Sequence, residues 1–260
     1  MRLRFLGTGT SFGVPQVGCA CDVCRSEDPR DKRTRVGALL ESDGLRLLID
    51  TPPELRLQLI AAGVDRVDAV LFTHDHADHT HGIDDIRSIS VRRDGALPMY
   101  GPAETLASLA RKFAYIFDES MKALPGTSKP EGFAQALEAG VATRIGHLDV
   151  LPVEVPHGRL RVFGYRIGRL AYVTDAKSLP DGVIAQLRGA DVLVINALFR
   201  TAHPTHLSIG EAVDAARRVG ASRTYLTHLT HETSHADLAA SLPSGVEPAY
   251  DGLTVEIPDA

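Results

Sequence analysis

The chain has 260 residues, of which 44% are hydrophobic and 23% charged, a composition typical of a globular protein with a sizeable core. Its net charge of −5 gives no support for a nucleic-acid-binding surface, and no apolar run approaches the roughly 20 residues that span a bilayer. The first seven residues, Met1 to Gly7, alternate like a strand and lack the apolar core of a signal peptide. In a cytosol the three cysteines of the chain would stay reduced. We therefore expect a cytoplasmic protein with one domain over residues 1–260.

The predicted elements begin with short strands joined by tight turns and continue with strands that alternate with helices. Strand-like apolar runs fall at Leu3–Leu6, Gly37–Glu41, Arg46–Ile49, Ala69–Phe72, Arg161–Ile167, Ala171–Val173, Val192–Ile195, Thr224–Leu226 and Leu253–Ile257. Helices are expected at Pro53–Ala62 and at Ser208–Val219, where Ser208 and Glu211 form a capping box. This mixture predicts an α/β protein with two sheets and helices outside.

The stretch from Thr105 to Leu148 fits this pattern less well. It begins like a helix and continues with Phe113, Tyr115 and Phe117 into a stretch that contains proline and glycine. We interpret residues 105–148 as an insertion or lid near the active site. An ordinary surface excursion is the alternative.

Four potential metal ligands directly follow the apolar strand that ends at Thr73. The sequence T-H-x-H-x-D-H contains His74, His76, Asp78 and His79. Imidazole and carboxylate groups bind Zn, Mn or Fe. His74 and His76 are two apart, so on an extended segment they point the same way and can share one ion. Asp78 and His79 can reach a second ion. A polar turn with solvated histidines is the alternative, but it does not suit four ligands after a buried strand.

Four local ligands cannot fill two sites, so further ligands must come from later in the chain. His157, Asp175 and His228 each follow an apolar strand, which is the same arrangement. For any one of them alone, a cap or turn residue is the alternative. Together they predict two divalent ions, Zn or Mn with Fe as a further choice. Ions about 3.5–4 Å apart can hold both the attacking and the leaving oxygen of a displacement.

The three cysteines lie in one loop at about residues 18–25: Cys19, Cys21 and Cys24. The spacing C-x-C-x-x-C suits a tetrahedral zinc bound by three thiolates and one nitrogen. The missing ligand should be a histidine elsewhere in the chain, and His231 and His235 are the candidates. A redox switch or free thiols are the alternatives.

The order of these ligands, T-H-x-H-x-D-H followed by His, Asp and His, resembles the metallo-β-lactamase superfamily. This resemblance implies a four-layer αββα sandwich with the metal site at one edge of the two sheets. It also implies the ligand sets: His74, His76 and His157 for the first metal, Asp78, His79 and His228 for the second, with Asp175 as the bridge.

Within the superfamily, the sequence from Leu6 to Ser11, then G-V-P and C-x-C-x-x-C, is similar to the branch of phosphoribosyl cyclic phosphate phosphodiesterases, the PhnP family. That similarity implies a structural zinc bound by the three cysteines and by His231, the second histidine of a T-H-x-x-H motif. A closed four-ligand site has no open position, so its role would be folding and not chemistry.

Related phosphodiesterases use a histidine ahead of a helix to protonate the leaving group, and His206 lies immediately before the capped helix. Histidine can act as a general acid near neutrality. A solvated loop histidine is the alternative for His206, and His203 is its nearest competitor. Asp78 and His206 are therefore the expected catalytic residues, and Asp84 is expected to orient a ligand histidine.

The expected function is metal-dependent hydrolysis of a small phosphodiester, cyclic or linear, with His206 as general acid. One alternative is a lactone, thioester or amide hydrolase on the same metal pair. Another is a non-catalytic accessory or carrier protein like that of pyrroloquinoline quinone (PQQ) biosynthesis, which a full ligand set disfavours. The expected partner is a small-molecule substrate. Nucleic acid and membrane are not expected as partners, and assembly into a homodimer is left open.

Overall fold

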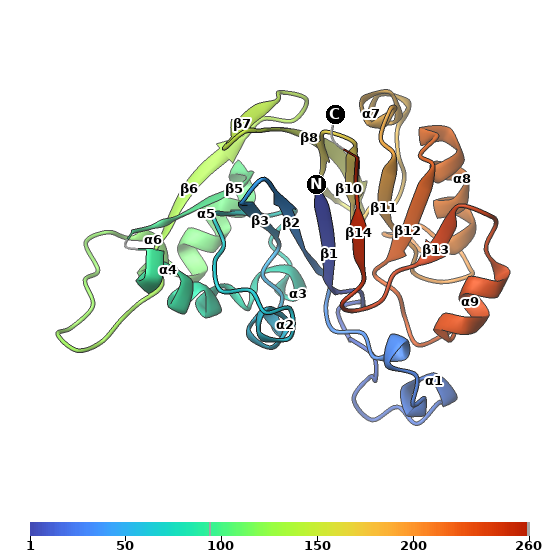
Figure 1. Ribbon diagram of the computed structural model, residues 1–260, viewed down its shortest axis with the longest axis horizontal. Helices are drawn as coiled ribbons and strands as arrows, with labels where there is room; N and C mark the ends of the chain where they lie inside the picture. Colours follow the sequence, from blue (N-terminus) through green and yellow to red (C-terminus); the bar gives the residue numbers. More distant parts are fainter. Residues whose placement is uncertain (94, 259–260) are drawn as a thin grey trace.

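Two mixed β-sheets face each other in the computed structural model, which describes residues 1–93 and 95–258 (Figure 1). The strands of the first sheet, in their order across it, are β14 (Thr254–Glu256), β1 (Arg2–Gly7), β2 (Gly37–Ser42), β3 (Leu45–Ile49), β4 (Ala69–Leu71), β5 (Leu97–Pro102) and β6 (Gly132–Leu137). Those of the second are β13 (Val246–Pro248), β12 (Arg223–Thr227), β11 (Val192–Asn196), β10 (Leu170–Val173), β9 (Leu160–Ile167), β8 (Leu148–His157) and β7 (Thr143–Ile145). In each sheet one half is antiparallel, and the other half, β3 to β6 or β10 to β13, is parallel.

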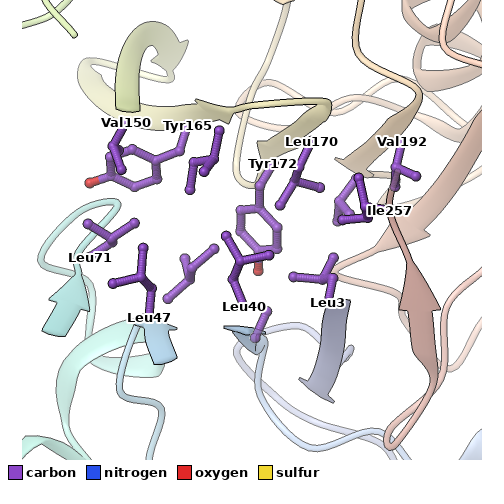
Figure 2. Packing of buried hydrophobic residues seen from close by; sticks show 14 of the residues in the cluster. Leu3, Leu40, Leu47, Leu71, Val150, Tyr165, Leu170, Tyr172, Val192 and Ile257 are labelled. Carbon is purple, nitrogen blue, oxygen red and sulfur yellow. The ribbon is translucent and has the colours of Figure 1, made fainter. Parts of the chain in front are cut away.

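The strands of both sheets are apolar on two faces because each sheet lies between two other layers. Successive side chains of a strand point to opposite faces. In β10, Tyr172 therefore faces the first sheet, whereas Val173 faces the helices on the outside. Figure 2 shows the core between the sheets, where Leu40 and Leu47 from the first sheet meet Tyr165 and Tyr172 from the second.

Helices cover the outer face of each sheet. The helices in the first half of the chain are α1 (Asp22–Arg25), which lies in the cysteine loop, α2 (Leu55–Ala61), α3 (Ala77–Thr80), α4 (Arg87–Arg93), α5 (Ala103–Lys112) and α6 (Ala114–Phe117), with 3₁₀ turns η1 (Pro29–Asp31) and η2 (Ile83–Ile86). Those in the second half are α7 (Asp181–Leu187), α8 (Ile209–Val219) and α9 (His235–Ser241). The helices α2, α4, α5 and α6 bury apolar side chains against the first sheet, and α7, α8 and α9 do so against the second. This confirms the four-layer αββα sandwich.

The capping box expected at the start of α8 is present. The Ser208 hydroxyl accepts from the Glu211 backbone N–H, and the Glu211 carboxylate accepts from the Ser208 N–H. The helix ends at Gly220 in the left-handed conformation. The cap matters for the site because His203 and His206 lie in the loop before α8, and the cap fixes the end of that loop.

The stretch 105–148 contributes to both sheets. After α5 and α6 it forms β6 and β7, which are the edge strands of the first and the second sheet. The sequence did not predict either strand, because several side chains of β6 are exposed and blur its alternation. Whether the loop between α6 and β6 acts as a lid stays a prediction. Among the described residues, no helix is both long and apolar enough to cross a membrane.

Candidate metal centre

The candidate ligands meet at one edge of the sandwich, where strands of both sheets end. His157 is the last residue of β8, and Asp175 and His228 follow β10 and β12. Asp50 at the end of β3, Asp175 and His228 have φ angles of 62°, 58° and 58°, which lie in the left-handed region. A non-glycine residue there costs on the order of 1–3 kcal/mol, and such strain is concentrated at functional sites. The residues that follow β3, β10 and β12 therefore share this strained backbone conformation.

The structure brings the expected ligands into two adjoining trios. In each trio, one ligand atom from every residue lies within 4.8 Å of the others. The trios are His74, His76 and His157, and Asp78, His79 and His228. Both match the sets that the superfamily resemblance implies.

Asp175 lies between the two trios. Its Oδ2 is 3.2 Å from His79 Nε2, and its Oδ1 is 3.3 Å from His228 Nε2. Asp175 also groups with His74 and His79 within 4.8 Å. One carboxylate thus reaches both trios, which is the position that a bridging ligand needs.

The buried nitrogens of this site fit a divalent metal. Among the described residues, Nε2 of His74, Nε2 of His79 and both ring nitrogens of His228 are buried without a hydrogen-bond partner. A buried polar group left unpaired costs about 1–3 kcal/mol and is rare in native proteins. Ligation would satisfy Nε2 of each ring, and imidazole with carboxylate is a donor set for Zn, Mn or Fe.

Asp50 orients His79 and was missed by the sequence analysis. Its Oδ2 lies 2.7 Å from His79 Nδ1, and the backbone N–H and hydroxyl of Thr73 each donate to Asp50 at 2.8 Å. Burial raises the pKa of Asp50, although the charge of His79 opposes this. A sequence signal existed, because Asp50 follows an apolar strand in the same way as Asp175 does.

The carboxylate that we expected in this orienting role, Asp84, does not fill it. Asp84 instead accepts hydrogen bonds from Arg87 and from the Tyr115 hydroxyl, both at 2.8 Å. The reason is their place in the fold: Asp84 lies in η2, beyond α3, whereas Asp50 directly follows β3, the strand that pairs with β4.

His206 lies beside both trios. Its Nε2 is 3.0 Å from Asp175 Oδ1, and its ring is stacked on that of His228 with 4.8 Å between centroids. The side chain is 12% exposed. Burial lowers the pKa of His206, although the hydrogen bond to Asp175 opposes this. The imidazole is in neither of the two trios, but it forms a further group of potential ligands with His157 and Asp175, again within 4.8 Å.

The three cysteines and His231 form a separate four-residue group. His231 Nδ1 lies 3.3 Å from the Sγ atoms of Cys19 and Cys21 and 3.5 Å from that of Cys24. A tetrahedral zinc with its usual bond lengths would place nitrogen and sulfur about 3.6 Å apart, so the four residues fit one. The other candidate, His235, packs against the ring of Tyr250 instead.

The surroundings shift the pKa values of Cys21 and Cys24 in opposite directions. The Cys24 backbone N–H, followed by the hydrogen bond with His231, lowers the pKa of Cys21 to about 6. Burial raises the pKa of Cys24. A bound cation would favour the deprotonated form of all three, because the thiolate is the form that binds metal.

The chain is similar to known proteins over most of its length. Residues 45–229 match the family model described as a β-lactamase superfamily domain. A solved structure, described as a new diphosphatase from the PhnP family, is 38% identical with a TM-score of 0.91, over 99% of this chain and 98% of that one.

Two further relatives are known by their sequences. An octanoyltransferase of Porphyromonas gingivalis is 40% identical over 97% of this chain, but the chain spans only 51% of that protein's length. A ribonuclease Z of Bradyrhizobium sp. is 28% identical over 87% of this chain and 96% of the relative.

Proposed function

Because the chain belongs to the β-lactamase superfamily, and within it to the PhnP family, we propose that it is a metal-dependent phosphodiesterase acting on a small phosphodiester. The observation that carries the proposal is His206. Its Nε2 faces Asp175 at 3.0 Å from outside the two ligand trios, and it groups with His157 and Asp175 within 4.8 Å. An imidazole beside a metal pair suits a reaction in which an alkoxide leaving group needs a proton.

In this proposal the first trio and the second trio would each hold one divalent ion, and Asp175 would serve both. When bound, such ions lower the pKa of water towards neutrality and offset the negative charge on phosphoryl oxygens. Asp50 holds His79 in position through its Nδ1, and the Thr205 carbonyl does the same for His157. His206 donates a proton from Nε2 to the departing oxygen. The cysteine site holds a zinc with a structural role.

The relatives support this choice without deciding the substrate. A diphosphatase and a ribonuclease Z both cleave phosphate ester or anhydride bonds, as their names say. This chain matches only about half of the octanoyltransferase, so the activity of that protein does not carry over to this chain. An accessory protein without catalysis would not need a complete ligand set together with His206.

A substrate panel tests the proposal. We expect the zinc- or manganese-loaded protein to hydrolyse bis(4-nitrophenyl) phosphate and a five-membered cyclic phosphodiester. A diphosphate ester, an octanoyl thioester and a lactone complete the panel. Hydrolysis of the thioester or lactone, with neither phosphodiester cleaved, would overturn the proposal.

The role of His206 is tested by the leaving group. General acid help is typically worth about 10²–10⁴-fold, so His206→Ala should slow cleavage of an alkyl phosphodiester by that order. A nitrophenolate leaves without protonation, so its release should change far less. Equal losses on both substrates, or loss of metal, would show that His206 acts otherwise.

A further inference from the structure

Thr205 lies between His206 and two other histidines, and its polar groups contact all three. Its hydroxyl is 2.8 Å from His206 Nδ1 and 3.1 Å from His203 Nδ1. Its carbonyl oxygen is 3.0 Å from His157 Nδ1. We propose that Thr205 is the positioning residue of the proton donor: it holds the His206 ring so that Nε2, and not Nδ1, faces the metal centre. The inference rests on the proposed role of His206.

The contacts of Thr205 with the two histidines converge on their Nδ1 atoms. The Thr205 N–H donates to His203 Nδ1 at 3.4 Å, so that nitrogen is an acceptor. The Thr205 hydroxyl lies 3.1 Å from the same nitrogen, and His206 Nδ1 lies 3.4 Å from it. The shortest of these contacts is that of the hydroxyl with His206 Nδ1, at 2.8 Å, and in either direction it occupies that nitrogen.

This arrangement assigns the two ring nitrogens of His206 different tasks. Nδ1 is held by the Thr205 hydroxyl at 2.8 Å. Nε2 lies on the other side of the ring, 3.0 Å from Asp175 Oδ1. Nε2 is consequently the nitrogen that faces the metal centre, where a leaving group would be.

The backbone on both sides of His206 is anchored, so the hydroxyl has a fixed position from which to act. The carbonyl of Thr205 binds His157, and the N–H of Leu207 donates to the Ala176 carbonyl at 2.8 Å. Thr205 also packs closely on Gly158, where a Cβ atom would lie 2.9 Å from its methyl group. The loop is thereby attached to the strand ends that carry His157 and Asp175.

Two substitutions separate the hydroxyl from the rest of the side chain. Thr205→Val keeps the shape and the methyl group but removes the hydroxyl, and Thr205→Ser keeps the hydroxyl. Both keep the carbonyl that binds His157, so metal content should equal that of the unsubstituted protein. His206→Ala is measured in parallel on an alkyl and a nitrophenyl phosphodiester.

We expect Thr205→Val to slow the alkyl phosphodiester about tenfold, the usual value of one orienting hydrogen bond, and to leave the nitrophenyl diester nearly unchanged. Thr205→Ser should restore the alkyl rate. A crystal structure of Thr205→Val should show the His206 ring turned from its place beside Asp175.

The inference is overturned if His206→Ala depends on the leaving group and Thr205→Val does not, if Thr205→Ser behaves like Thr205→Val, or if metal is lost. If His206→Ala itself shows no dependence on the leaving group, the general-acid role fails and the inference fails with it.

Discussion

His228 and His231 are only three positions apart, yet their rings belong to different candidate metal sites. His228 Nε2 faces Asp175 at 3.3 Å in the active-site group, whereas His231 Nδ1 lies 3.3 Å from Cys21 in the cysteine group. The segment between them is held by the first loop of the chain, since Leu229 forms a β-bridge with Gly9.

Buried Arg33 fixes the same segment from the other side. Its side chain donates to the backbone carbonyls of Thr230 and Thr233 and pairs with buried Asp31 at 3.3 Å. The cysteine site and the active site thus share a rigid support. Loss of the cysteine site should therefore also weaken the active site.

Replacing Cys21 by Ser should therefore have two effects. The protein should lose its structural zinc and unfold at a lower temperature, because binding to such sites contributes to folding free energy. It should also bind metal more weakly at the Asp78, His79 and His228 trio. Metal analysis after dialysis and thermal unfolding measure both, with exposed Asp22→Asn as the control in the same loop. Unchanged zinc content in Cys21→Ser would contradict the assignment.

Asp50→Asn should weaken the second metal site without changing the first. The amide keeps the size of the side chain but loses the charge that holds His79 Nδ1. Partners of this kind are typically worth about 10–100-fold in metal affinity. Competition with a coloured chelator gives the affinities, and Asp84→Asn serves as the control. If Asp84→Asn has the larger effect, our assignment of the orienting carboxylate is wrong.

Asp175→Asn should uncouple the two active-site ions. Asn tolerates the left-handed backbone at this position, so the substitution tests the bridge and not the fold. We expect hydrolysis of every phosphodiester to be lost while the zinc at the cysteines is retained. A fully metallated crystal with a single ion and Asp175 turned away from it would rule out the dinuclear site.

Two tyrosines of the inter-sheet core should respond differently to loss of their hydroxyls. Tyr165 donates to the Phe72 carbonyl, whereas the buried Tyr172 hydroxyl has no hydrogen-bond partner among the described residues. Tyr165→Phe leaves a buried carbonyl unpaired and should cost about 1–3 kcal/mol of unfolding free energy, while Tyr172→Phe should be neutral or stabilising. Chemical denaturation of both variants checks this, and equal losses would contradict it.

The sequence by itself determined the class of site. Strands that end in His or Asp, together with T-H-x-H-x-D-H and C-x-C-x-x-C, were enough to predict the candidate ligands that the structure gathers. Their division into two sets, and the choice of His231 over His235 for the cysteine group, came from the family resemblance. The candidate ligands were readable because strand periodicity and ligand chemistry are local properties of the chain. Strands β5, β6, β7 and β13 were not predicted. Most side chains of β6 are exposed and so lack a clear pattern, and β7 and β13 are only three residues long.

Only the tertiary structure decided which side chains orient the ligands. Asp50 and His79 are 29 positions apart, and Thr205 and His157 are 48 apart, yet both pairs are in hydrogen-bond contact. Their meeting depends on which strands are neighbours and on how each strand end turns. A hydrogen bond between distant residues requires both partners within about 3 Å, and that placement comes from the packing of the two sheets and not from any local pattern.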